Sequence, residues 1–287
     1  MKDKNNATCC FKSLVKVVSL AEFCAGDIKE YYAIILRGRP CNTKSGCRCC
    51  DYHDGTVSFY SPKNHRQDSD NTACIPVHDK QAIDTALLFS DKLLSCSEGT
   101  WRAEDFSFFN YYYKESLHVS QCEKRKLEGC MQDISEELSW GVDKYSCRLI
   151  LRKIETMLLY CKRFFDRQFL MRNETCKCIM SKIDTEIDKY IATRHSAEVT
   201  MEATSFIAEN LQMSGAYLAD YIMSNNGYTM QEYMHHRQIE TAKRMMTHTG
   251  KSMAQISKEL GFSSTRQMTL VFQSLYGITP REYRELT

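Results

Sequence analysis

The sequence predicts an α+β protein in which a β-rich segment and a helical segment precede an all-α C-terminal part. Two strand-like runs, Glu30–Gly38 and Gly55–Pro62, lie in the first quarter of the chain, whereas residues 83–194 show helical periodicity. The last third contains two successive helix-turn-helix patterns joined by one long helix. With 287 residues, 43% of them hydrophobic, the chain is long enough for two domains that each have a core.

The second helix-turn-helix pattern is the sharper of the two. Ser252 and Gln255 have the spacing of a capping box, so a short helix is expected to begin at Ser252. Gly261 is expected to end this helix, because glycine tolerates the left-handed conformation of a tight helix stop. Ser264 with Gln267 has the spacing of a cap that opens the next helix.

The first pattern repeats this plan upstream. Residues 201–211 are expected to form a supporting helix, and Ser214–Leu218 opens the helix that follows and ends at Gly227. Thr229 then begins a long spacer helix between the two units. After the second unit, Thr279–Glu282 combines an N-cap threonine, a proline at the first helical position and a glutamate, which predicts a closing helix.

This C-terminal pattern resembles the AraC/XylS family of transcription regulators. The matching positions are Ser214, Tyr217, Leu218, Gly227, Thr229, Glu232, Tyr233, Arg237, Ala242, Lys243, Ile256, Gly261, Phe262, Ser264, Phe272, Gly277, Thr279, Pro280, Tyr283 and Arg284. So many fixed spacings are more specific than a lone helix-turn-helix match. The resemblance implies a seven-helix domain, residues 179–287, that lays two recognition helices in successive major-groove segments of DNA. It also implies that residues 1–172 sense an effector, dimerise, or both.

The candidate DNA-binding residues come from the two helices expected to enter the groove. Arg266 and Gln267 offer the paired hydrogen bonds that guanine and adenine edges accept, and Thr265 lies beside them. The first unit presents alanines, which meet thymine methyl groups, and Asp220, which accepts from cytosine, so the second unit is expected to read more sequence. Tyr217 also fits the alternative role of a core residue. The full candidate set is Ser214, Ala216, Tyr217, Ala219, Asp220, Lys251, Ser264, Thr265, Arg266, Gln267 and Arg281.

The charge of the C-terminal part is low for a DNA binder. From Ser196 onward, eight Lys/Arg and nine Asp/Glu give a net charge of minus one with histidine neutral. Family members often place arginine or lysine late in each recognition helix, where this chain has Asp220, Leu270 and Gln273. Because DNA binders draw much of their affinity from neutralised phosphates, we expect weak non-specific binding and a shallow salt dependence. A protein-interaction module with weak DNA binding is an alternative.

The two strand-like runs resemble, in their order, the small cupin-like β-barrel that forms the sensing half of many members of this family. The barrel is expected over about residues 11–76. A metal-binding cupin would need histidines and a carboxylate that converge inside the barrel. The spacing of His53, His65 and His78 does not provide this arrangement, so these residues are expected at the surface or in contact with a ligand.

A helical part is expected over about residues 83–170. Within it, the aromatic stretch Trp101–Tyr113 is expected to pack against the barrel. The periodic helix Leu149–Phe165 is expected to cover the barrel or to pair with its copy in a homodimer. Residues 171–178 then form the expected linker to the DNA-binding domain.

The fifteen cysteines are unusual for a chain of this size. Their odd number and the absence of an apolar run at the N-terminus favour reduced thiols. Close thiols bind zinc or copper(I), or act as a redox pair. The adjacent pair Cys49 and Cys50 does not have the CxxC geometry of a zinc knuckle, and no second CxxC motif is present to complete a site, so no metal or cofactor is predicted. The densest group comprises Cys41, Cys47, Cys49 and Cys50.

Together these features predict a sequence-specific, DNA-binding transcription regulator that responds to a small effector. The expected partners are double-stranded DNA, RNA polymerase, a small-molecule effector and a second copy of the chain. We expect no membrane association and a cytoplasmic location, since no run approaches the roughly 18 apolar residues of a membrane span. The sign of regulation stays open, with activation as the expectation. Catalysis is not expected, although a thiol- or metal-responsive regulator and a zinc-dependent DNA-repair protein are alternatives.

Overall fold

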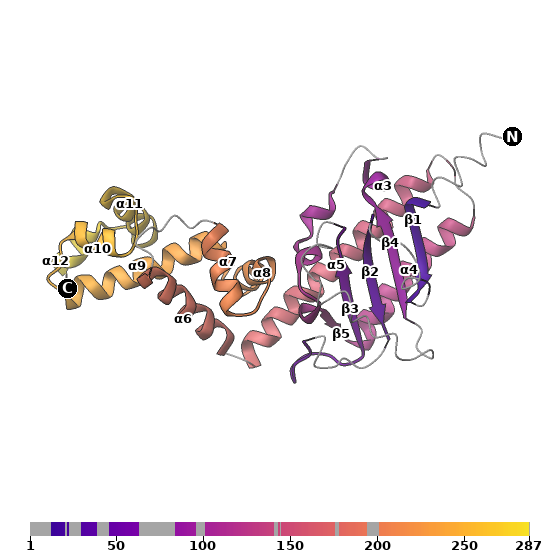
Figure 1. Ribbon diagram of the computed structural model, residues 1–287, viewed down its shortest axis with the longest axis horizontal. Helices are drawn as coiled ribbons and strands as arrows, with labels where there is room; N and C mark the ends of the chain where they lie inside the picture. Colours follow the sequence, from indigo (N-terminus) through magenta and orange to yellow (C-terminus); the bar gives the residue numbers. More distant parts are fainter. Residues whose placement is uncertain are drawn as a thin grey trace. The chain divides into compact units, whose positions relative to one another are not determined.

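The computed structural model describes residues 13–20, 22, 30–38, 46–62, 84–95, 101–140, 143, 145–175, 178–193 and 201–286. Cys41, His65 and His78, which the sequence singled out, lie outside these ranges. The chain divides into two compact units, residues 1–172 and residues 173–287 (Figure 1). None of the helices in the described ranges is long and apolar enough to cross a membrane.

Unit 1 contains a five-stranded antiparallel sheet. Its strands are β1 (Val15–Ser19), β2 (Tyr31–Arg37), β3 (Gly55–Tyr60), β4 (Thr85–Ser90) and β5 (Leu117–Val119), in the order β1-β4-β2-β3-β5. Within the described ranges, β1 and β5 form the two edges and do not pair with each other. The sheet is therefore open, and the expected closed barrel over residues 11–76 is wrong for the described part of the chain.

Strand β4 also corrects the expectation that residues 83–170 are helical. A short, continuous apolar run fits a buried strand as well as a buried helix, and only Thr85 in this strand is not fully buried. β4 pairs with β1 on one side and β2 on the other, so both its edges are hydrogen-bonded, and its buried residues alternate between the two faces of the sheet. Helical structure begins after it with α3 (Asp91–Ser95), and β5 interrupts it again before α4 (Gln121–Ser139) and α5 (Ser146–Thr175).

Aromatic side chains fill one face of the sheet. Tyr32 and Phe89, which are opposite each other on β2 and β4, stack with their ring centroids 5.5 Å apart. On β3, the ring centroid of Phe59 lies 4.3 Å from that of Phe108 and 5.8 Å from that of Phe165 on α5. These contacts confirm that the aromatic stretch packs on the sheet and that the long helix covers it (Figure 1). The stretch itself forms 3-10 turns at Ala103–Asp105, Ser107–Asn110 and Tyr113–Glu115.

Helix α5 also protects the edge strand β5. The buried Gln168 accepts a hydrogen bond from the backbone N–H of His118 at 2.7 Å and donates one to the carbonyl of Ser116 at 3.2 Å. Arg167 donates to the carbonyl of His118 at 2.8 Å and forms an ion pair with Glu123. An edge strand otherwise presents open backbone groups to other strands. Side chains of α5 thus take the place of a further strand.

Unit 2 is all-α, as expected. The helix borders agree with the capping signals in the sequence, so the expected helices are confirmed. Helix α5 continues to Thr175, which makes the first residues of the expected linker, 171–178, helical. The helices of unit 2 are α6 (Cys178–Thr193), α7 (Met201–Asn210), α8 (Gly215–Asn226), α9 (Met230–His248), α10 (Met253–Glu259), α11 (Thr265–Tyr276) and α12 (Pro280–Leu286).

Candidate nucleic-acid interface

Helices α10 and α11 form the second helix-turn-helix unit. Ser252 and Gln255 make the predicted capping box at the start of α10. Gly261, with φ of +76°, provides the left-handed turn between the helices. The hydroxyl of Ser264 accepts the backbone N–H of Gln267 at 3.1 Å and so caps α11. The helix-turn-helix prediction is confirmed at this level.

The two units are related by a repeat of 50 residues. The serines cap α8 and α11, and the glycines end these helices with φ of +72° and +73°. Each threonine and glutamate pair then caps the next helix. Because the caps match, α8 and α11 have the same length of 12 residues. The equivalent pairs are Ser214 and Ser264, Gly227 and Gly277, Thr229 and Thr279, and Glu232 and Glu282.

Helix α9 is the spacer between the two units. Its 19 residues span about 28 Å, since a helix rises about 1.5 Å per residue. Arg237 donates to Asp188 at 2.6 Å and lies 3.5 Å from Asp184, so it pairs within the fold. Tyr233 donates to Asp184 at 2.6 Å, and burial together with this carboxylate raises the pKa of Tyr233. These bonds fix α9 to α6.

The end of α11 is fixed to the same spacer. Tyr276 donates a short hydrogen bond to Glu240 of α9, and this bond lowers the pKa of Glu240. Lys243 adds an ion pair with Glu240 at 3.3 Å, and its ammonium lies 4.4 Å from the centre of the Tyr276 ring. The recognition helix of the second unit is therefore tied to α9 by both charge and ring contacts.

The outer face of α8 is small and weakly polar. Ser214 and Tyr217, both expected at the interface, are 3% and 2% exposed. Ser214 caps the helix, and Tyr217 packs in the core. Met223, by contrast, is 43% exposed although the sequence prediction omitted it. The side chains on the outer face are Ala216, Ala219, Asp220 and Met223.

The outer face of α11 carries Arg266, Leu270 and Gln273. These residues are four and three positions apart, so they line one side of the helix, and Leu270 is 58% exposed. Gln267 has a different role, since its side-chain carbonyl accepts from the backbone and hydroxyl of Ser263 at 2.9 and 2.8 Å. The structure uses Gln267 to hold the turn, and Gln273 is the exposed amide on this helix.

The cations predicted beside the recognition helices have carboxylate partners. Lys251 lies 2.6 Å from Glu259, and Arg281 lies 3.5 Å from Glu285 on the exposed side of α12. Arg284 donates to the backbone carbonyl of Lys251 at 2.7 Å and so joins α12 to the start of the second unit. These pairings lower the positive charge that the domain offers to phosphates.

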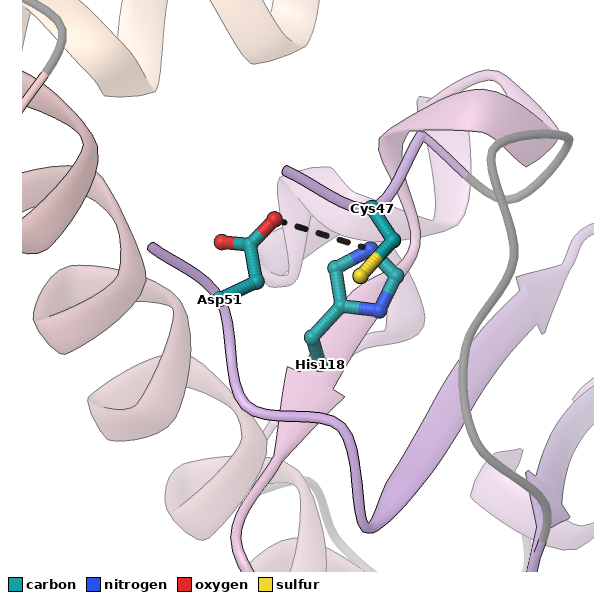
Figure 2. A group of neighbouring side chains, drawn as sticks. All are labelled: Cys47, Asp51 and His118. Atoms are coloured by element: carbon teal, nitrogen blue, oxygen red, sulfur yellow. Dashed lines mark ion pairs between the residues drawn. The ribbon is translucent and has the colours of Figure 1, made fainter. Parts of the chain in front are cut away.

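A second group of reactive side chains lies in unit 1 (Figure 2). Cys47, Asp51 and His118 each place one possible ligand atom within 4.8 Å of the others. The Nε2 atom of His118 is 4.0 Å from Asp51, and both side chains are buried. The sequence prediction included Cys47 only, because the strand that carries His118 is remote from the cysteine-rich segment.

Two observations argue against a metal at this group in the state that the structure shows. Arg172 binds both carboxylate oxygens of Asp51, at 2.9 and 2.6 Å, and the backbone N–H of Arg48 binds one of them at 2.7 Å. Burial alone would raise the pKa of Asp51, but the bonds and charge of Arg172 hold it below its usual range. Cys47 is disulfide-bonded, and a zinc site requires a thiolate.

Comparison with known proteins identifies the C-terminal helices. Residues 207–286 match the family model described as a helix-turn-helix domain. The chain is 26% identical over 97 residues to the regulatory protein PocR of Salmonella typhimurium, across 34% of this chain and 31% of that protein. It is 28% identical over 98 residues to the probable transcriptional regulator LumQ of Photobacterium leiognathi, across 34% of this chain and 38% of that protein.

The matches cover less than half the length of these two curated relatives, 31% and 38%. Both relatives are named as regulators. Among solved structures, the C-terminal domain of the two-component response regulator yesN from Fusobacterium nucleatum aligns with a TM-score of 0.31 and 25% identity, over 37% of this chain and 97% of that one.

Proposed function

We propose that this chain, which belongs to the AraC/XylS family of transcription regulators through its C-terminal domain, regulates transcription by binding DNA with α8 and α11. The 50-residue repeat is the observation that carries the proposal, since it gives two equally long recognition helices with matching caps. The spacer of about 28 Å is close to the ~34 Å of one DNA turn, so the two helices suit successive segments of the major groove.

Base recognition is concentrated on α11 in this proposal. Arg266 suits a guanine, Gln273 suits an adenine, and Leu270 suits a thymine methyl group. Thr265 and Ser264 lie at the N-terminus of the same helix, where hydroxyls and backbone N–H groups favour a phosphate. Lys251 and Arg281 are further phosphate contacts once their carboxylate partners give way.

Helix α8 contributes less sequence information. Ala216, Ala219 and Met223 suit contacts with thymine methyl groups, and Asp220 accepts from the amino group of cytosine. An acidic side chain is repelled by phosphates, so Asp220 disfavours any register in which the backbone approaches it. The first unit therefore contributes mainly through the shape of its surface and through the repulsion of phosphates by Asp220.

Unit 1 is the sensing and dimerisation part in this proposal. A cavity of about 450 Å³ at the ends of the strands has the size of a ligand site, and Tyr31, Asp91 and Lys92 contribute to its lining. Its charged lining suits a polar effector. Effector binding would change DNA occupancy or contact with RNA polymerase, with activation as the expected outcome, and a homodimer would double the number of half-sites. Because its target is DNA, we place the protein in the cytoplasm.

Selection from a random DNA pool at low salt tests the proposal. The full-length protein should enrich a two-part motif whose halves are about one helical turn apart. Arg266→Ala should relax the preference at one base of the better-defined half, by about 1–3 kcal/mol. Gln267→Ala should leave the motif unchanged, because that side chain holds the turn, whereas Gln273→Ala should relax a second base.

Arg152→Ala is the matched control, since it removes an exposed arginine from α5 in unit 1. It should alter neither the motif nor the affinity. A folded protein that enriches no motif contradicts the proposal and favours a protein-interaction role. An unchanged motif in Arg266→Ala would show that α11 does not read bases as proposed.

A further inference from the structure

The loop between β2 and β3 is bound to the last turns of α5. Its described residues, 46–54, are called the cysteine loop below. Arg172 of α5 donates to both oxygens of Asp51 and, at 3.1 Å, to the backbone carbonyl of Gly46. Asp51 and Arg172 are 4% and 2% exposed, so the contact excludes water. The conformation of the cysteine loop and the position of the end of α5 are therefore coupled.

The backbone of this loop has little freedom to shift. Gly46 has φ of +74°, and a Cβ atom there would lie 1.6 Å from the carbonyl oxygen of Lys114. Asp51 also accepts the N–H of Arg48, which closes a turn within the loop. A change at any residue of this turn is thus transmitted to Asp51 and Arg172.

Cys47 directly precedes Arg48, the first residue of that turn, and is oxidised. It is disulfide-bonded, and its sulfur lies 3.5 Å from Nδ1 of His53 and within 4.8 Å of the Asp51 carboxylate and the His118 ring (Figure 2). Cys49 and Cys50 of the same loop are not disulfide-bonded. Cys47 is only partly buried, so small thiols can approach it. A disulfide and two thiols in one loop are the components of thiol–disulfide exchange.

We propose that Cys47 is a thiol–disulfide exchange site for low-molecular-weight thiols and disulfides, and that its redox state sets how firmly the cysteine loop holds Arg172. A thiolate of a dithiol reductant attacks one sulfur of the Cys47 disulfide, and the other sulfur leaves as a thiolate and takes up a proton. The second thiol of the reductant then closes its own disulfide and releases the remaining protein sulfur. The protein gains two electrons and two protons, which the dithiol loses.

The end of α5 is the element that a change at Cys47 would affect. Unit 1 ends at Arg172, and α5 continues to Thr175 into the segment that enters unit 2. Loosening of the cysteine loop frees the buried guanidinium and lets the last turns of α5 fray. The effect on DNA occupancy rests on the proposed function, whereas the exchange site and the loosening do not.

Thiol labelling with mass spectrometry and hydrogen exchange test the site in the full-length protein. Dithiothreitol should expose the Cys47 thiol to labelling and raise amide exchange in residues 46–54 and 168–175 by about tenfold, which corresponds to about 1.4 kcal/mol of local stability. Cys47→Ser should show the fast exchange with or without dithiothreitol. Cys122→Ser, which removes an exposed thiol from α4, is the matched control and should respond like the wild type.

Three results would overturn the inference. One is a Cys47 thiol that is labelled fully before reduction under air. Another is reduction of Cys47 with unchanged amide exchange in residues 168–175. The third is one zinc ion per reduced chain that protects Cys47 from labelling, since Cys47, Asp51 and His118 would then act as metal ligands. These readouts need no DNA, so they stand apart from the test of the proposed function. DNA affinity measured with and without dithiothreitol then reports the regulatory effect alone.

Discussion

The buried ion pair between Asp51 and Arg172 gives the sharpest stability prediction. Arg172→Met keeps an unbranched side chain of similar length but removes the cation and its donors. Asp51 would stay buried and would keep the hydrogen bond from the backbone N–H of Arg48. Burial would then dominate, so the pKa of Asp51 would rise and the carboxyl group would take up a proton on folding.

The expected cost is about 3–5 kcal/mol, because removal of one partner leaves an uncompensated charge in the interior. Domains of this size are stable by about 5–15 kcal/mol, so the loss would make unit 1 marginal. The double variant Asp51→Asn with Arg172→Met should lose less than Arg172→Met alone, since the uncompensated charge is then absent.

Tryptophan fluorescence during urea unfolding measures this effect in unit 1 alone. Both tryptophans of the chain, Trp101 and Trp140, lie in unit 1. Arg152→Met is the control, because its ion pair with Glu155 is half-exposed and should contribute less than about 1 kcal/mol. A loss below about 1 kcal/mol in Arg172→Met, or a double variant less stable than Arg172→Met, would refute the reasoning.

Three further predictions concern pH, helix ends and salt. The pKa of Asp51 is lower in the folded than in the unfolded chain, so the ion pair of Asp51 with Arg172 stabilises unit 1 fully above about pH 4, and this stabilisation is lost as the pH falls further. The urea midpoint measured by fluorescence should therefore fall with pH in this range, and Arg172→Met should not show this decrease. Gly277→Ala should cost unit 2 about 1–2 kcal/mol, seen as a lower melting temperature by circular dichroism, because φ is +73° although no neighbour would clash; Gly250→Ala is the control and should cost less. In a plot of the logarithm of the DNA-binding constant against the logarithm of the salt concentration, the slope should be shallower than about −4, because each neutralised phosphate contributes about −0.9. A steeper slope would contradict the expectation that the low charge of unit 2 limits its phosphate contacts.

The helices of unit 2 were predictable because their signals are local. Ser264 caps α11 through a residue three positions away, and Gly277 ends the helix in its own backbone conformation. Such signals act within one helical turn, so they can be recognised without knowledge of the fold. The same signals recur at Ser214 and Gly227, which is why both units could be placed.

The sheet of unit 1 was predictable only in part because its pairings are not local. β4 was missed since its continuous apolar run has no period that separates a strand from a helix. The barrel was wrong because closure depends on pairing between edge strands that are remote in sequence, β1 and β5, and no local signal reports such a pairing. β4 is hydrogen-bonded along both edges because it lies between β1 and β2, and no local signal in its sequence indicates this position.

Contacts between side chains that are remote in sequence could not be predicted for the same reason. Asp51 and Arg172 are 121 positions apart, and neither residue type indicates its partner. Gln267 suits both a capping role and a base contact, so the sequence alone could not decide between them. Its bonds to Ser263 place the Gln267 side chain in the turn before α11, whereas Arg266 and Gln273 are exposed on that helix.

Low charge and internal pairing together shape how such a domain selects its target. Arg237 is paired with two aspartates of α6, and Lys243 with Glu240, so these cations serve the spacer and the helices packed on it. A small contribution from phosphate contacts weakens binding to every sequence alike, whereas the base contacts proposed for Arg266 would act on the correct sequence alone. The ratio of specific to non-specific affinity can therefore stay high while the absolute affinity is modest, and a redox-dependent change in the end of α5 would need only a small free-energy effect to alter occupancy.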